Sequence, residues 1–301
     1  MSINHQLLLF EELQSLNRDL RAKDATVPEQ NELRKLLEEA GAVFANITDY
    51  PLPKKNFNFS AVDGSFVSMG IDPNSLYLFS ALAKNFKNEK ESVYKIKIHS
   101  NNDPDDTETK PRILPALELN TTLKYLENFP HPNANLLFFD GGFSRYQRHS
   151  SDEFRKLKQY VLNTNITIIG VIEEIQSKLI SKILKLENDF TDKYLLAGLL
   201  KPGEFLYFPE HRKDNFFTVF CRFSNDINPV AFDFLPEQTE NFIDILNFAN
   251  LLTPKAGRGI PIFIDVVDHE VKIKQNISSE LVKATFELRP QLVLLPKRSQ
   301  R

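Results

Sequence analysis

Two apolar stretches of the sequence each lead to an aspartate that is followed at once by glycine. The stretch Asn58–Val67 places Asp63 before a Gly-Ser pair, and the later stretch Leu136–Phe139 places Asp140 before a Gly-Gly pair. Each pattern predicts a buried strand that ends at its aspartate and presents the carboxylate at the edge of a sheet. One Asp-Gly turn after a strand is common in any α/β protein. Two of them favour a fold that brings the two carboxylates together.

The composition is that of an ordinary globular protein large enough to bury a full core. The 301 residues are 42% hydrophobic and 26% charged, and no apolar run is long enough to cross a membrane. Cys221 is the one cysteine, so no internal disulfide can form, and we expect it to be a small buried strand residue. With no signal-peptide layout at the N-terminus, these features predict a cytoplasmic protein. The net charge of −3 does not indicate nucleic-acid binding, but it leaves room for a local basic channel.

The first 50 residues predict a helical region that precedes one large domain over residues 51–301. Apolar residues at helical spacing predict helix over 5–41, with a break near Pro28. Residues 57–99 predict an antiparallel meander with strands at 58–67, 75–83 and 93–99. The acidic segment 100–111 lacks the glycine and terminal glutamate of a calcium-binding EF-hand loop, so we expect a solvated loop there.

Helices and strands alternate in the remainder of the chain, with no internal repeat and no low-complexity linker. We expect helices at 112–128, 151–163, 175–188, 237–252 and 278–288, and strands at 135–139, 166–172, 205–208, 216–223, 229–235, 260–267 and 291–295. The predicted fold class is therefore α/β, with a mixed sheet flanked by helices and a β-rich C-terminal elaboration.

The predicted order of three strands, a helix, a strand, a helix and a strand is that of the ribonuclease H-like fold. In that fold the first strand, the next helix and the fourth strand each supply an acid to one site, and these positions hold Asp63, Glu118 and Asp140. Clustered carboxylates repel one another unless a cation lies between them. Two Mg²⁺ or Mn²⁺ ions roughly 3.5–4 Å apart can hold the attacking and leaving oxygens of a phosphodiester. Glu118 would ordinarily be a solvated helix residue, but its neighbours are apolar.

The ordered set of these motifs resembles the NurA nuclease family over roughly residues 55–295. The matching segments are Ala61-Val62-Asp63-Gly64-Ser65, Glu118 on the next helix, Phe139-Asp140-Gly141-Gly142, Thr191-Asp192 leading to Pro202-Gly203-Glu204, and Gly259-Ile260-Pro261 leading to Asp268-His269.

The resemblance implies a ribonuclease H-like homodimer with a central DNA channel and a HerA-type hexameric ATPase as partner. It also implies Mn²⁺-dependent 5′-to-3′ exonuclease and single-strand endonuclease activity. Asp63, Glu118 and Asp140 are carried over as metal ligands, and Asp268 or His269 as a late site residue. This chain departs from the family pattern in two places. Ile260 stands where an aromatic residue is common, and Glu173-Glu174 stands where a lysine is frequent, which makes Glu173 a candidate additional ligand.

Basic residues near these motifs are candidate DNA contacts. Arg145, Arg148 and Lys178 would suit phosphate groups, although a solvated face explains such residues equally well. Tyr146 could stack on a base, but we favour a tyrosine that is packed or exposed at the surface. The chain has no Walker A motif and no G-x-G-x-x-G, so we expect any ATP hydrolysis to belong to a partner.

The sequence thus predicts a metal-dependent DNA nuclease of DNA end processing and repair, using Mn²⁺ or Mg²⁺, with two ions expected. Two alternatives stay open. One is a non-catalytic scaffold of the same fold that docks on an ATPase ring. The other is an actin-like phosphotransferase, whose paired Asp-Gly turns also lie at strand ends, although glycine-rich phosphate hairpins are missing here.

Overall fold

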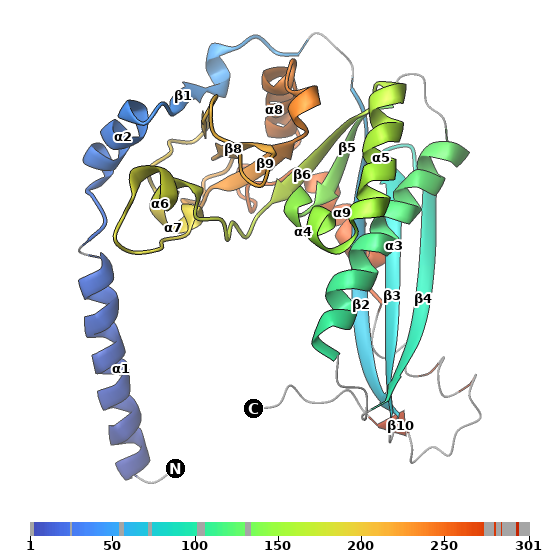
Figure 1. The fold of residues 1–301 in the computed structure, drawn as a ribbon, viewed down its shortest axis with the longest axis horizontal. Helices are drawn as coiled ribbons and strands as arrows, with labels where there is room; N and C mark the ends of the chain where they lie inside the picture. Colours follow the sequence, from blue (N-terminus) through green and yellow to red (C-terminus); the bar gives the residue numbers. More distant parts are fainter. Residues whose placement is uncertain are drawn as a thin grey trace.

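A mixed sheet with helices on both faces forms the body of the protein (Figure 1). The computed structural model describes residues 3–24, 26–53, 57–71, 74–100, 106–129 and 134–273, together with positions 280, 284, 293 and 294. The predicted α/β class is confirmed.

The N-terminal region holds two helices and then joins the sheet. Helices α1 (Ile3–Asp24) and α2 (Gln30–Glu39) are separated near Pro28, as the sequence predicts. Strand β1 (Val43–Asn46) and the short helix η1 (Ile47–Asp49) follow, and β1 pairs antiparallel with β7 (Glu204–Tyr207). Helix α1 extends away from the sheet in Figure 1. The domain boundary near residue 50 stays a prediction, with β1 as a direct link between the two regions.

The sheet runs in the order β1-β7-β8-β9-β6-β5-β2-β3-β4, and β10 pairs with β2 off this path. The strands not yet placed are β2 (Asn58–Ile71), β3 (Asn74–Asn85), β4 (Lys90–Ser100), β5 (Ala134–Asp140), β6 (Thr167–Ile172), β8 (Phe217–Cys221), β9 (Val230–Phe234) and β10 (Val293–Leu294). The antiparallel meander β2-β3-β4 is joined in parallel by β5 and β6. This is the strand arrangement of the ribonuclease H-like fold that the element order predicts.

Strand β2 does not end at Asp63, so the predicted Asp-Gly turn is wrong at this position. The antiparallel partner β3 pairs with β2 from Ser60 to Ile71 and holds it extended beyond the aspartate. The parallel partner β5 pairs with β2 only as far as Val62. Asp63 therefore lies where β5 stops and β2 continues, which opens one side of β2 at that point.

Helices α3 (Asp106–Asn128), α4 (Phe143–His149) and α5 (Ser151–Thr164) follow one another around β5. The loop expected over 100–111 is wrong for its second half, because α3 begins at Asp106. Helix α4 is an element that the sequence analysis missed. The helix expected over 175–188 is also wrong in extent, since α6 covers only Leu179–Leu184 and a separate α7 covers Asp192–Leu196.

The predicted strand at 260–267 is wrong as well, because this segment begins helix α9 (Ile262–Val271). Its buried residues Ile264, Val267 and Val271 are three and four positions apart, which is helical spacing. This spacing is hard to detect in the sequence because the run at 260–267 is itself largely apolar. Pro261 caps the helix. Helix α8 (Phe242–Leu251), preceded by η2 (Pro236–Gln238), lies within the predicted 237–252 segment. Most of the predicted helix at 278–288 lies outside the described residues.

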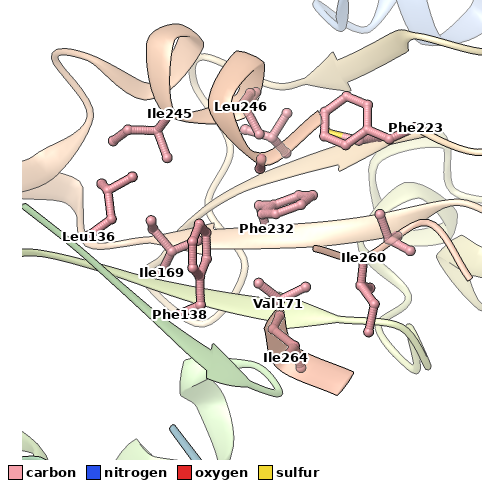
Figure 2. Close-up of a cluster of buried hydrophobic side chains, with 14 of the residues drawn as sticks. Leu136, Phe138, Ile169, Val171, Phe223, Phe232, Ile245, Leu246, Ile260 and Ile264 are labelled. Carbon is pink, nitrogen blue, oxygen red and sulfur yellow. The ribbon is translucent and has the colours of Figure 1, made fainter. Parts of the chain in front are cut away.

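The alternation of side chains along β5 divides the core into two clusters, one on each face of the sheet. Phe138 joins the face covered by α8 and α9, which Figure 2 shows with Ile169, Val171 and Ile264. Phe139 joins the opposite face, covered by α3, α4 and α5. A third cluster packs α2, α6 and α7 on the β7–β8–β9 part of the sheet. Cys221 is buried in β8, as predicted. Among the described residues, no helix has the length and apolarity needed to span a membrane.

Candidate metal centre

Three carboxylates meet beyond the end of β5. Asp63, Asp140 and Asp268 each offer an oxygen, and these three oxygens all lie within 4.8 Å of one another. Asp63 is 7% exposed, and the other two are partly buried. Oxygen atoms at this spacing, from three carboxylates, are the ligands that a hard divalent cation such as Mn²⁺ or Mg²⁺ takes.

Each of the three aspartates comes from a different element. Asp63 lies in β2, Asp140 is the last residue of β5, and Asp268 is on α9, which packs against the same face of the sheet as Ala61. Helix α9 is fixed by Glu270, whose two oxygens accept hydrogen bonds of 2.5 Å each from Lys84 and Lys90. The hydroxyl of Ser80 on β3 donates to the carbonyl of the helix's last residue at 2.8 Å.

Burial and mutual repulsion make the trio costly to ionise without a cation. Burial, reinforced by the charges of Asp140 and Glu118, raises the pKa of Asp63 to about 8. Burial also raises the pKa of Asp140, against the opposing effect of Arg145. Lys272 forms an ion pair of 2.5 Å with Asp268 at the exposed side of the trio. The donor set fits a divalent cation, which would stabilise the ionised form of all three acids.

Glu118 lies close to this trio but reaches it from the other face of the sheet, and it is not one of the three clustered acids. Its side chain is fully buried, and Oε2 accepts a 2.6 Å hydrogen bond from Arg145 Nη2 and another from the hydroxyl of Tyr146. Tyr146 is itself fully buried, so of the readings offered by the sequence the structure shows the packed tyrosine, and the ring is not available to stack on a base. Helix α4, which the sequence analysis missed, turns this ring inward.

The other predicted site residues have different surroundings. His269 is exposed, one position after Asp268, and lies outside the clustered trio. Glu173 pairs with Arg258, which also binds Asp265, so it is engaged in an ion-pair network rather than in the trio. Ile260 is buried in the core.

The three candidate DNA-contacting residues also differ from one another. Arg145 is bound to Glu118, and Lys178 pairs with Asp189 at 3.0 Å. Arg148 is exposed and lines a cavity of about 410 Å³ together with Arg145, His149, Ser177 and Lys213. Gly142, two residues after Asp140 in the chain, is another lining residue, whereas none of the three clustered aspartates lines the cavity.

A buried ion pair that supports the site was missed in the sequence. Asp233 is fully buried in β9 and accepts hydrogen bonds from Lys213 (3.1 Å), from the Thr218 hydroxyl (2.6 Å) and from the backbone amide of Phe143 (3.2 Å). The last bond holds the start of α4 directly after the Asp140 turn. The one signal in the sequence was an aspartate within the otherwise apolar strand 229–235.

Two acids of the motifs that carry the family resemblance are also structural. Asp192 accepts hydrogen bonds from the Ser177 hydroxyl and from the amides of Leu179 and Ile180, which fixes the start of α6. Glu204 pairs with Arg34 of α2 at 2.7 Å.

Comparison with known proteins places this geometry in a family. The family model described as the NurA domain matches residues 57–273, most of the chain. The chain belongs to the NurA domain family. The predicted family is therefore confirmed, and the actin-like alternative loses its support. No significant match was found among curated proteins.

NurA structures share this fold at low sequence identity. The crystal structure of the NurA nuclease from Sulfolobus solfataricus is similar with a TM-score of 0.62 and 14% identity, over 95% of this chain and 97% of that one. A NurA structure with manganese gives a TM-score of 0.57 at 13% identity, over 94% and 100% of the two chains. A NurA structure bound to dAMP and manganese gives 0.58 at 12% identity, over 97% and 99%.

Proposed function

We propose that this chain is a metal-dependent DNA nuclease whose metal centre is formed by Asp63, Asp140 and Asp268. The observation that carries the proposal is the meeting of three carboxylate oxygens within 4.8 Å, from three elements of a NurA-family fold. NurA structures with manganese, and with dAMP and manganese, support a divalent metal and a nucleotide substrate.

The residues of the chain have separable tasks in this reaction. A bound divalent ion would supply an activated water and stabilise the leaving oxygen of the phosphodiester. Asp63 and Asp140 would hold the ion beyond the end of β5, and Asp268 would bind it from α9. Glu118 is the acid that would be available to a second ion, so we extend the proposal to two ions. His269 stays a prediction as a site residue.

DNA binding is proposed along the cavity next to Gly142. Arg148 is exposed there and forms no ion pair within the part of the chain that the structure describes, so its charge is available to a phosphate. Arg145 lines the same cavity and contributes positive charge, although Glu118 already binds it. Lys178 is the weakest of the three candidates because of its pairing with Asp189.

We also propose the homodimer and the HerA-type ATPase partner that the family resemblance implies. Apolar side chains on α1 support a protein interface there, because the described ones are more than half exposed: Leu8, Leu9, Phe10, Leu13 and Leu16. Light scattering of the purified protein would test the homodimer, with Leu9→Glu/Leu13→Glu expected to yield monomer. The 5′-to-3′ polarity, the endonuclease activity, the role in repair and the cytoplasmic location stay predictions from the sequence.

End-labelled single-stranded and duplex DNA incubated with the protein and Mn²⁺ would test the nuclease. We expect cleavage that requires the metal and falls to background in Asp63→Asn. Asp152→Asn is the matched control, because Asp152 is an exposed aspartate on α5 whose one ion pair within the described ranges is with Arg155, three residues on. Cleavage that survives in Asp63→Asn, or that proceeds in EDTA, would refute the mechanism. Inactivity of the wild-type protein with every divalent metal, alone and with the ATPase, would favour the scaffold alternative.

A further inference from the structure

The two carboxylate oxygens of Glu118 have different surroundings. Oε2 accepts hydrogen bonds from Arg145 Nη2 at 2.6 Å and from the Tyr146 hydroxyl. Oε1 is buried and has no hydrogen-bond partner among the residues that the structure describes. An unsatisfied buried carboxylate oxygen is costly, because it has lost water without gaining a donor. A buried oxygen of this kind is commonly satisfied by a bound ion or water molecule.

Oε1 lies against the backbone of β2 directly after the metal centre. A β carbon built on Gly64 would stand 2.4 Å from Oε1, so the absence of a side chain at this position lets the carboxylate approach the strand. Gly64 follows Asp63, the most buried member of the trio. The unpartnered oxygen therefore lies beside the residue that follows the candidate metal ligand Asp63 in β2.

Arg145 connects Glu118 to the end of β5. The same Nη2 atom that binds Glu118 also donates to the backbone carbonyl of Asp140 at 2.8 Å and contacts the Tyr146 hydroxyl at 2.7 Å. One guanidinium thus fixes the distance between an acid of α3 and the residue that supplies an acid from β5. Because Arg145 and Tyr146 both bind Glu118 through Oε2, neither of them occupies Oε1.

Tyr146 holds its hydroxyl in place through the aromatic core. Its ring packs edge-on against Phe139 with centroids 5.4 Å apart and stacks on Phe154 at 6.1 Å. Phe139 is the residue before Asp140 in β5, so the same strand supports both the Tyr146 ring and the Asp140 carboxylate. The hydroxyl therefore has little freedom to leave Oε2.

We propose that Arg145 and Tyr146 are positioning residues that hold Glu118 by Oε2 and so direct Oε1 at a divalent cation. This inference rests on the proposed nuclease function and assigns a role to two residues that do not themselves contact the metal. Hydrogen bonds to the distal atoms of metal ligands fix the orientation of the ligand, and their loss costs roughly 10–100-fold in metal affinity.

Titration calorimetry with Mn²⁺ alone, in metal-free protein, would test this role. Tyr146→Phe keeps the ring packing and removes only the hydroxyl, and Arg145→Met is compared with the conservative Arg145→Lys. We expect Tyr146→Phe and Arg145→Met to weaken the Glu118-dependent ion by about 10-fold or more, with Arg145→Lys between them and the wild type. Excess Mn²⁺ should restore DNA cleavage by Tyr146→Phe. Arg148→Ala, on the same helix, is the control for Mn²⁺ affinity.

Several outcomes would overturn the proposal. Wild-type Mn²⁺ affinity in Tyr146→Phe and Arg145→Met would show that neither residue positions a ligand. Tighter Mn²⁺ binding in Arg145→Met would show that the guanidinium competes with the ion. Wild-type stoichiometry and affinity in Glu118→Gln would remove Glu118 from the metal site. In each case Mn²⁺ binding that still depends on Asp63 would leave the proposed nuclease standing, whereas wild-type protein that binds no Mn²⁺ would refute both.

Discussion

Gly64 lies so close to Glu118 that a β carbon at position 64 would stand 2.4 Å from Glu118 Oε1 and 2.8 Å from Leu114 Cδ1. The glycine of the Asp-Gly-Ser motif is therefore needed for a close approach between a strand and a helix and not for a turn. Helix α3 approaches strand β2 closely at this point because Gly64 has no side chain.

Gly64→Ala should displace Glu118 from its position beside β2. We expect a loss of about 1–3 kcal/mol in the free energy of unfolding, from overpacking, and a fall of roughly 10-fold or more in Mn²⁺ affinity, from the moved carboxylate. Urea unfolding and Mn²⁺ titration measure the two effects separately. Gly257→Ala is a control elsewhere in the chain, where the new carbon would meet its nearest neighbour at 3.2 Å. Unchanged Mn²⁺ affinity in Gly64→Ala would contradict the assigned role of Glu118.

Asp268→Asn and His269→Ala should separate the two late candidates. Asp268 lies within the acid trio, whereas His269 is exposed on the neighbouring position of α9. We expect Asp268→Asn to lower Mn²⁺ affinity by an order of magnitude or more, since it removes a charged ligand. His269→Ala should have a much smaller effect. Calorimetry and cleavage rates measure both, and the reverse ranking would move the third ligand from the aspartate to the histidine.

The stability of the metal-free protein should fall as pH rises. The pKa of Asp63 is about 8 in the folded chain, against 3.8 for an ordinary aspartate, so the folded state keeps a proton that the unfolded state releases between these values. The free energy of unfolding contributed by this group is therefore greatest below about pH 4 and declines up to about pH 8. Thermal unfolding in EDTA from pH 5 to 8 should show a steeper decline in the wild type than in Asp63→Asn. Equal slopes would contradict the raised pKa.

Mn²⁺ binding should show the opposite dependence on pH. Since Asp63 must lose its proton to become a ligand, affinity should rise with pH up to about 8 and then level off. Calorimetry in buffers of different ionisation enthalpy would detect the released proton directly. Binding without proton release at pH 6.5 would show that Asp63 is already ionised there.

Asp233→Asn should strongly lower the free energy of unfolding, although the substitution hardly changes the size of the side chain. It leaves the amine of Lys213 buried beside a neutral amide, and breaking a buried ion pair costs about 3–5 kcal/mol. The exposed pair of Asp152 and Arg155 offers a comparison, where Asp152→Asn should cost less than about 1 kcal/mol. Urea unfolding measures both. A similar small cost at the two positions would show that Asp233 is not a structural anchor of α4.

The positions of the acids could be predicted from local strand patterns and from the order of the strands and helices along the chain. Asp63 and Asp140 stood out as acids in apolar, β-prone stretches, and the meander with its following helix and strand pointed to Glu118. Their environments could not be predicted in the same way. Whether Asp63 ends a strand or continues it depends on how far β3 and β5 each pair with β2, which is a long-range property.

The errors near the C-terminal acids have a similar origin. The run at 260–267 is short and apolar, so it fits a buried strand or a buried helix, and the packing of α9 on the sheet decides between them. The inward direction of Tyr146 depended on α4, whose seven residues include two arginines and a histidine and gave no apolar stripe to detect. The ion pair of Asp233 and Lys213 joins residues that local patterns cannot relate.

The acid trio is assembled from β2, β5 and α9, and the last of these is synthesised about two hundred residues after the first. A chain that is still emerging from the ribosome carries Asp63 and Asp140 well before it carries Asp268. Lys84 in β3 and Lys90 at the start of β4, which pair with Glu270 of α9, are likewise synthesised long before their partner. The proposed metal centre is thus completed only after α9 has been synthesised, and a chain that ends before α9 lacks one of its three acids.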